Sequence, residues 1–271
     1  MKLGLLSAIL DGWSFEEMID VVSDMGFSCV EVACWPQGKA ERRYAGVSHI
    51  DVEHLDAKKA EEILAYCREK QVEISALGYY PNTMDADLEK REACIRHLLK
   101  VIDASALLSV NMVTTFIGRD LYNSVEENVE LVKEIWPPIL AHAREKGVRI
   151  AIENCPMLFG EDQWPGGHNL MTSPANWKKI FEILPDDNLG INYDPSHFVW
   201  QMMDYIKQIY EFKDKIFHVH YKDIKLYGEK LKQVGTMAYP LEYMSPNLPG
   251  LGEVDWAKYV IALTDIGYEG C

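Results

Sequence analysis

The sequence predicts an α/β fold, a (β/α)8 (TIM) barrel in which parallel strands are joined by helices that lie outside them. Two observations predict it. Short apolar segments alternate with amphipathic helical segments along the chain, and a glycine often ends the helical segment directly before the next apolar one. Parallel strands joined by crossover helices form a closed barrel or an open doubly wound sheet. A length of 271 residues suits one barrel domain over 1–271.

The first helical segment shows this pattern in full. Over 14–25, Phe15 and the apolar residues after it recur at steps of three and four, as they do on the buried face of a helix. Ser14 and Glu17 have the spacing of a capping box, in which each side chain binds the other residue's backbone N–H. Gly26 ends the helix, because glycine tolerates the left-handed conformation after the last turn. A strand over 28–34 follows.

The same junction returns in the middle of the chain. Ser124 and Glu127 form a second capping box at the start of a helix over 124–146. Pro137 and Pro138 lie inside this helix and predict a kink, because proline removes a helical hydrogen bond. Gly147 then ends the helix before a strand over 148–154.

Applied to the whole chain, the pattern gives seven strands and seven helices. The strands are expected near 3–8, 28–34, 73–79, 109–116, 148–154, 188–194 and 216–221. The helices are expected near 14–25, 56–70, 86–104, 124–146, 174–184, 203–213 and 255–266. Longer loops over 35–55, 155–173 and 222–254 follow the carboxyl ends of strands, which form the catalytic face of such barrels.

The last segment leaves the pattern incomplete. The final helix runs into DIGYEGC, which repeats the junction of helix, glycine and strand, so an eighth strand would begin at about Cys271. A barrel of seven strands has two unpaired edges, which folded proteins normally avoid. We therefore expect a truncated product that ends before the eighth strand, rather than an unusual closure of the barrel.

Composition limits the classes of partner. The net charge of −15 disfavours nucleic acid, because an acidic surface repels phosphate backbones and anionic membranes. The first residues lack the apolar length of a signal peptide, and no segment reaches the roughly 18 apolar residues of a membrane helix. The six cysteines form no C-x-x-C pair, which disfavours a zinc ribbon or a disulfide scaffold. We expect a cytoplasmic protein that binds neither nucleic acid nor a membrane.

Three consecutive strands end in residues that can bind a metal ion: Glu153 in IAIENCP, Asp194 in NYDPSH and His220 in FHVHYKD. Two carboxylates and an imidazole suit Mn, Co, Mg or Zn. A single residue of this kind at a strand end is more often a cap or a satisfied polar group. Because a barrel brings the ends of neighbouring strands together, three such residues favour one divalent metal site.

The two-residue period of a strand predicts which side chains point into the barrel. In LGINYD the apolar residues face the helices, so Gly190, Asn192 and Asp194 point inward. In IFHVHY, Phe217 is expected to face the helices, whereas His218 and His220 point inward. His218 would lie deeper in the barrel than His220, which favours a structural role for it.

The motifs IENCP, YDPSH, HVHYKD and PGLGEVDW together resemble the sugar phosphate isomerase/epimerase superfamily of xylose-isomerase-like barrels. The similarity in order and spacing spans essentially the whole chain. The resemblance implies one metal ion bound by Glu, Asp, His and a second Glu on the eighth strand. The first three ligands match Glu153, Asp194 and His220, and the fourth has no counterpart in this chain.

The resemblance also implies roles for two further residues. His197, three residues after Asp194, matches a position that contacts substrate hydroxyls beside the metal, and we expect it to take part in catalysis. A loop-capping histidine is the alternative reading of His197. Glu31 points inward at the end of the second strand and matches a polar residue beneath the substrate.

Three more residues are candidate substrate contacts because of their chemistry. Trp35 follows a strand end, and its flat face suits the C–H faces of a sugar ring. His168 lies at the glycine-rich tip of the fifth loop, which could close over a ligand. Lys222 follows the candidate ligand His220 and could meet a negatively charged substrate or intermediate, although a solvated pair with Asp223 is equally compatible.

Such a site supports proton abstraction next to a carbonyl, with the metal ion stabilising the enediolate and Glu153 as the candidate general base. We expect an isomerase or epimerase that acts on a small-molecule sugar or sugar derivative. Ketose 3-epimerases carry a carboxylate and an arginine where this chain has Phe159 and Leu226. A metal-dependent lyase or dehydratase acting on a keto-sugar or 3-keto-glycoside is therefore the alternative.

Two other classes use the same barrel. AP endonucleases need a cluster of metals, additional histidine ligands and a basic surface, none of which this acidic sequence offers. A non-catalytic sugar-binding barrel stays open, because the fourth metal ligand is missing. The sequence does not decide the sugar, the metal, or whether the protein is a homo-oligomer.

Overall fold

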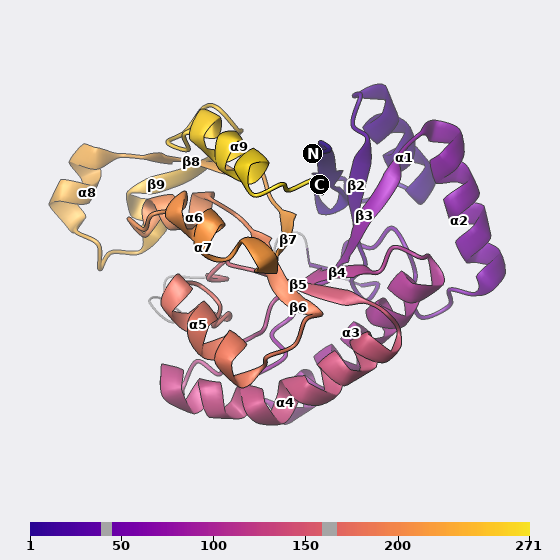
Figure 1. The fold of residues 1–271 in the computed structure, drawn as a ribbon, viewed down its shortest axis with the longest axis horizontal. Helices are drawn as coiled ribbons and strands as arrows, with labels where there is room; N and C mark the ends of the chain where they lie inside the picture. The colour runs from indigo at the N-terminus through magenta and orange to yellow at the C-terminus, as the bar shows by residue number, and fades with distance from the viewer. Residues whose placement is uncertain (39–44, 159–166) are drawn as a thin grey trace.

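A curled sheet of seven parallel strands, paired in chain order, forms the centre of the structure (Figure 1). The structure is a computed structural model and describes residues 1–38, 45–158 and 167–271. The strands are β1 (Gly4–Leu6), β2 (Cys29–Ala33), β3 (Glu73–Gly78), β4 (Met112–Thr115), β5 (Arg149–Glu153), β6 (Leu189–Tyr193) and β7 (Ile216–Val219). All seven lie where the sequence predicted strands, and each pairs in parallel with the next.

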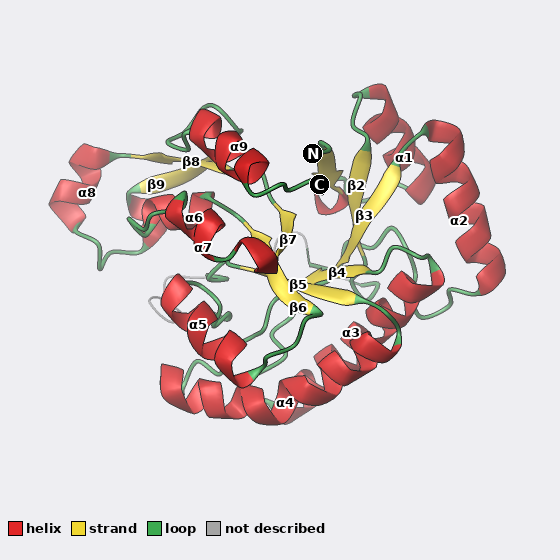
Figure 2. Ribbon diagram, in the orientation of Figure 1, coloured by secondary structure: helices red, strands yellow, loops and turns green. Residues whose placement is uncertain are grey.

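Helices cover the outer face of this sheet (Figure 2). They are α1 (Phe15–Asp24), α2 (Ala57–Lys70), α3 (Leu88–Leu107), α4 (Val125–Glu145), α5 (Pro174–Ile183), α6 (Ser196–Trp200), α7 (Lys207–Glu211) and α9 (Trp256–Asp265). The main apolar core lies between the two layers, where Val30 and Ile152 of the strands pack in the same cluster as Trp136 and Trp177 of the helices. Burial of this large apolar surface is the main force that holds the helices on the sheet.

The predicted helix ends are confirmed. Ser14 with Glu17 and Ser124 with Glu127 each form both hydrogen bonds of a capping box, at the starts of α1 and α4. Gly26 follows α1 with a φ of 78°, a left-handed conformation that suits glycine. Helix α4 continues through its two prolines, which lie on its exposed face, where water can satisfy the carbonyls that lose a helical donor.

The predicted helix over 203–213 is wrong in its bounds. Helix α6 begins at Ser196, because Asp194 accepts hydrogen bonds from the backbone N–H and the hydroxyl of Ser196 and so turns the chain directly after β6. Met202 then adopts a left-handed φ of 58°, which interrupts the helical path. A second short helix, α7, begins further along the chain, where Asp204 accepts hydrogen bonds from the backbone N–H groups of Ile206 and Lys207.

The long loop over 222–254 contains structure that periodicity did not predict. Strands β8 (Asp223–Leu226) and β9 (Met244–Asn247) form an antiparallel pair, and helix α8 (Gly228–Val234) lies between them in the chain. This arm extends away from the sheet (Figure 1). The buried Asp223 carboxylate anchors its base by accepting hydrogen bonds from the backbone N–H groups of Gly250, Gly252 and Val254.

The two ends of the chain lie beside each other, between β7 and β1 (Figure 1). The carbonyl oxygen of Cys271 accepts a hydrogen bond of 3.2 Å from the N–H of Val219 in β7. The carbonyl oxygen of Gly270 accepts one of 3.0 Å from the N–H of Lys2, just before β1. Within the described residues, the fold is thus a TIM barrel without its eighth strand, as predicted.

The inner face of the sheet has an apolar amino end. Ala76, Met112 and Ala151 pack together there, and Phe217 packs against them. Phe217 therefore points inward, and the prediction that it faces the helices is wrong. The register between β6 and β7 shifts beside it, and Gly190 leaves room for its ring, since a Cβ on Gly190 would lie 2.5 Å from Phe217 Cδ2.

None of the helices in the described ranges is both long and apolar enough to cross a membrane.

Candidate functional site

A cavity of about 600 Å³ opens along the inner face of the sheet. Its lining includes the polar side chains of Glu31, Tyr80, Glu153, His220 and Lys222. Glu31 lies within β2, and the other four end or follow β3, β5 or β7, so the barrel brings together residues that are far apart in the sequence. Apolar side chains such as Leu6, Ile9, Trp35 and Phe116 make up much of the remaining wall. A few polar groups in a mostly apolar cavity are typical of a ligand site.

Glu153 is the centre of the polar contacts. It ends β5 and is 4% exposed. Its Oε1 atom lies 2.8 Å from Nδ1 of His220 and 2.5 Å from the ammonium nitrogen of Lys222. The same ammonium lies 3.2 Å from Oδ2 of Asp194. Lys222 thus joins the two predicted carboxylate ligands, and His220 contacts the same oxygen of Glu153.

Asp194 is fully buried and held from several directions. Its backbone N–H donates to Asn154 and its Oδ1 accepts from the hydroxyl of Ser196 at 2.6 Å. Its Oδ2 has no hydrogen-bond partner among the described residues. Nε2 of His197 lies 3.3 Å from this oxygen and is likewise buried without a hydrogen-bond partner in the described part of the chain.

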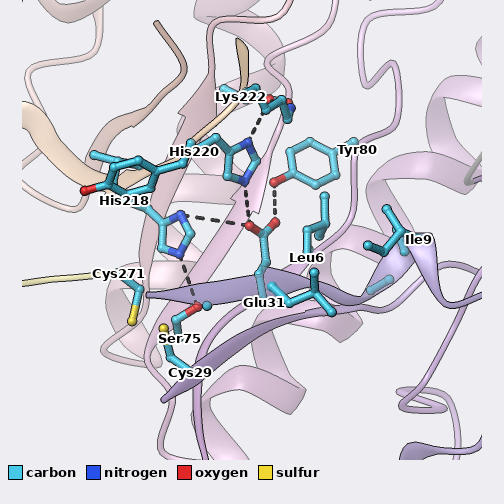
Figure 3. A pocket seen from close by; sticks show the side chains of 18 of the residues that line it. Leu6, Ile9, Cys29, Glu31, Ser75, Tyr80, His218, His220, Lys222 and Cys271 are labelled. Carbon is cyan, nitrogen blue, oxygen red and sulfur yellow. Dashed lines mark hydrogen bonds and ion pairs between the residues drawn. The ribbon is translucent and has the colours of Figure 1, made fainter. Parts of the chain in front are cut away.

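Glu31 forms a second centre of contacts across the cavity (Figure 3). Its Oε2 lies 2.7 Å from Nε2 of His220, and its Oε1 accepts a hydrogen bond of 2.6 Å from the hydroxyl of Thr114. The Tyr80 hydroxyl also donates to Oε1. His218 lies deeper, bonded to Asn192 at 3.1 Å and to Ser75 at 3.2 Å. His220 therefore bridges the two glutamates, Glu31 and Glu153.

Burial and charge oppose each other at these groups. Burial raises the pKa of the Glu153 and Asp194 carboxyls, but the cationic Lys222 and the nearby histidines outweigh it and hold both pKa values below their usual range. Burial lowers the pKa of Lys222, whereas the two carboxylates raise it further and keep the side chain charged. Asp194 and Glu153 are therefore ionised at neutral pH, and their charges face a single ammonium group.

The histidines differ in charge. Burial lowers the pKa of His220, but Glu31 and Glu153 outweigh it and raise the pKa to about 9. For His197, burial is outweighed by Cys155 and Asp194, and the pKa is again raised to about 9. Burial dominates at His218 and lowers its pKa to about 4. His218 is therefore neutral, whereas His197 and His220 are cationic when no metal ion competes with their protons.

These donors suit a divalent cation. Candidate ligand atoms of Glu153, Asp194 and His197 all lie within 4.8 Å of one another. The buried Oδ2 of Asp194 has ion-pair contacts with Lys222 and His197 but accepts no hydrogen bond among the described residues, so a cation that displaces Lys222 could bind this oxygen. Carboxylate oxygens with imidazole nitrogen are ligands for Mn, Co or Zn. His220, predicted as the third ligand, reaches this group through its contact with Glu153.

Of the other predicted residues, Trp35 and Lys222 line the cavity, and His168 does not. Trp35 lines the cavity, where its ring packs edge-on against Tyr79 at 4.9 Å between centroids. His168 lies 3.2 Å from the amide of Asn82, outside the residues that line the cavity. Lys222 binds the carboxylates of the site, whereas Asp223 binds the backbone of the arm, so the two do not form a solvated pair.

Sequence reasoning missed Tyr80, Thr114 and Asn192 as parts of the site. Thr114 lies on β4 and Tyr80 lies two residues after the end of β3, and no ligand was sought at either strand. Their hydroxyls bind Glu31, and the amide of Asn192 lies 3.1 Å from Nε2 of His220. The available signal was the two-residue period, which already pointed Asn192 into the barrel and would have done the same for Thr114.

Comparison with known proteins places the chain among related barrels. A family model described as a xylose isomerase-like TIM barrel matches residues 19–271. The uncharacterized protein YfiH of Bacillus subtilis (strain 168) is 22% identical over an alignment of 307 positions. This alignment covers 100% of this chain and 90% of YfiH.

Solved structures show the same fold at low identity. The 3-keto-D-glucoside 4-epimerase YcjR from E. coli superposes with a TM-score of 0.71 and 16% identity over 100% of this chain and 89% of that one. The probable 3-DHS dehydratase AsbF from Bacillus anthracis has a TM-score of 0.69 and 16% identity, over 98% of this chain and 89% of that one. The IOLI protein with a bound zinc atom has a TM-score of 0.70 and 18% identity, over 99% of this chain and 86% of that one. On the match over residues 19–271, the chain belongs to the family of xylose isomerase-like TIM barrels.

Proposed function

We propose that the protein is a divalent-metal-dependent isomerase or epimerase of a sugar or sugar derivative, which abstracts a proton next to a carbonyl group. One observation carries this proposal: the buried carboxylates of Glu153 and Asp194 face one point, where Lys222 forms an ion pair with both of them. Glu153, Asp194 and His220 would hold the ion, and His197 lies beside it. A bound divalent ion would polarise the substrate carbonyl as a Lewis acid.

Glu153 is the proposed general base. It is ionised, and it lies in the wall of the cavity where a substrate carbon can approach. Lys222 and His220 hold its pKa low, which makes it a weak base in the structure described. Because the proposed ion would take the place of Lys222 beside Glu153 and Asp194, the displaced ammonium group would be free to meet the negative charge that develops on the substrate oxygen.

The relatives support this reaction class. YcjR is a 3-keto-D-glucoside 4-epimerase, and the IOLI structure holds zinc. The activity and the zinc belong to those two proteins, but their folds match this chain over nearly its full length. A small carbohydrate in the cavity is the partner we propose, in a cytoplasmic protein that binds no nucleic acid, with Mn, Co, Mg or Zn as the ion.

A metal-dependent lyase or dehydratase is the second candidate. AsbF, which has the same fold, is a probable dehydratase. His197 favours the same reaction here, because its raised pKa keeps the imidazole protonated and its Nε2 lies 3.3 Å from Asp194 in the site. Elimination needs a proton donor for the leaving oxygen in addition to a base, and His197 would supply it.

Deuterium exchange tests the proposal. Metal-loaded protein is incubated in deuterated water with a panel of ketoses, inososes and 3-keto-glycosides. We expect deuterium at the carbon beside the carbonyl of at least one substrate, and no exchange with Glu153→Gln. Exchange with a new epimer or isomer supports the first candidate, and exchange with loss of water or an aglycone supports the second. No exchange with any substrate would overturn both and favour a sugar-binding barrel.

A further inference from the structure

We propose that Glu31 is a positioning residue, which fixes the His220 ring so that Nε2 carries the proton and Nδ1 faces the cation held beside Glu153. This inference rests on the proposed function, because it concerns the residue that orients one proposed ligand. It assigns to Glu31 a task different from contact with the substrate.

The contacts of His220 carry the first step. Its two ring nitrogens each face a carboxylate: Nε2 lies 2.7 Å from Glu31 (Figure 3), and Nδ1 lies 2.8 Å from Glu153. A neutral imidazole carries one proton, and the nitrogen without it is the ligand. Histidines that bind metals usually donate their other N–H to a carboxylate or carbonyl, which holds the ring and its tautomer. Glu31 occupies the place of that carboxylate.

Glu31 is itself held tightly. Its Oε1 accepts hydrogen bonds from the hydroxyls of Thr114 and Tyr80. Gly78 leaves the space for this oxygen, since a Cβ at that position would lie 2.7 Å from it. The side chain is 3% exposed, and both of its oxygens have partners. A carboxylate fixed in this way can orient a ring, and it has little capacity left for a sugar hydroxyl.

Asn192 offers the competing arrangement. Its amide nitrogen lies 3.1 Å from Nε2 of His220, and a hydrogen bond in that direction would require Nε2 to be unprotonated. The same nitrogen can donate to the hydroxyl oxygen of Tyr80, which lies 3.2 Å away. The contact with Glu31 is shorter and involves a charge, so it decides which nitrogen of His220 keeps the proton.

The test measures zinc affinity and the His220 tautomer. Calorimetric titration with Zn²⁺ compares wild type, Glu31→Gln, Glu153→Gln and the control Asp120→Asn, which alters another buried carboxylate that binds Tyr122 and Asn123. We expect Glu31→Gln to weaken binding by about 10–100-fold, as loss of such a partner does, and Asp120→Asn to leave it unchanged. An unchanged affinity in Glu31→Gln would overturn the inference.

A second readout does not depend on the variants folding. In ¹⁵N-labelled, zinc-loaded wild type, we expect His220 to show a protonated Nε2. A protonated Nδ1 would also overturn the inference. If wild type binds no zinc, or Glu153→Gln binds as well as wild type, the proposed metal site fails instead, which separates the two outcomes.

Discussion

The ammonium nitrogen of Lys222 lies 2.5 Å from Oε1 of Glu153 and occupies the side of this oxygen that also faces Asp194. A divalent ion bound between the two carboxylates would compete for the same position. The protein thus carries its own cation at the point where the proposed ion binds, and metal binding requires that this side chain moves.

Replacing Lys222 by methionine is expected to raise the affinity for Mn²⁺ by at least about tenfold, or 1.4 kcal/mol. The ion would no longer have to break an ion pair with Glu153 and Asp194. We expect substrate turnover to fall at the same time, because no ammonium remains to meet the developing charge. Isothermal titration and the exchange assay measure the two effects.

Lys225→Met is the matched control, because Lys225 is an exposed lysine that pairs with Glu253 on the arm. It should change neither quantity. Equal or weaker Mn²⁺ binding in Lys222→Met would show that the ammonium and the ion do not compete.

Stability of the metal-free protein should depend on pH through His197 and His220. Their folded pKa values are raised to about 9, above the value of about 6.5 in an unfolded chain. Protonation therefore favours the folded state, so this stabilisation is complete below about pH 6.5 and is lost as the pH rises through about 9.

We expect the midpoint of thermal unfolding to fall across this window, and to fall less steeply in His220→Asn. Differential scanning calorimetry of metal-free samples measures it. A midpoint that rises over the same range, or an identical slope in the variant, would contradict the proposed charge states.

Gly78→Ala should disturb the site from a distance. The new Cβ would lie 2.7 Å from Glu31 Oε1, and Tyr80 and Thr114 are within 3.3 Å. Overpacking of this kind costs about 1–3 kcal/mol, and the displaced Glu31 would release His220. We expect a lower free energy of unfolding and weaker zinc binding.

Gly228→Ala is the control for this change, because a Cβ there meets nothing within 4 Å. Denaturant titration and zinc calorimetry compare the two variants. If Gly78→Ala binds zinc as wild type does, the space at Gly78 does not matter for the site.

The repeated elements could be predicted because their signals are local. The capping boxes at Ser14 and Ser124 and the glycine at Gly26 each act within a few residues, so sequence spacing is enough to find them. The arm over 222–254 could not be predicted in this way. Its base is held by Asp223 through residues about 30 positions later, and that pairing exists only in the folded chain.

The candidate site was predictable in part for the same reason. Strand ends and the two-residue period brought Glu153, Asp194 and His220 to one rim. The contact of Lys222 with both carboxylates depends on side-chain torsions and on burial, which the sequence does not state. Thr114 belongs to the site because its hydroxyl donates to Glu31, which lies 83 residues away on another strand.

Anomalous diffraction from crystals loaded with Mn²⁺ tests the proposed site most directly. We predict one strong peak between the carboxylates of Glu153 and Asp194, within direct coordination distance of their oxygens, with Nδ1 of His220 as a further ligand and the ammonium of Lys222 displaced. Density for Lys222 that still contacts both carboxylates in fully loaded crystals, or a peak bound only elsewhere, would contradict the metal centre on which the proposed chemistry depends.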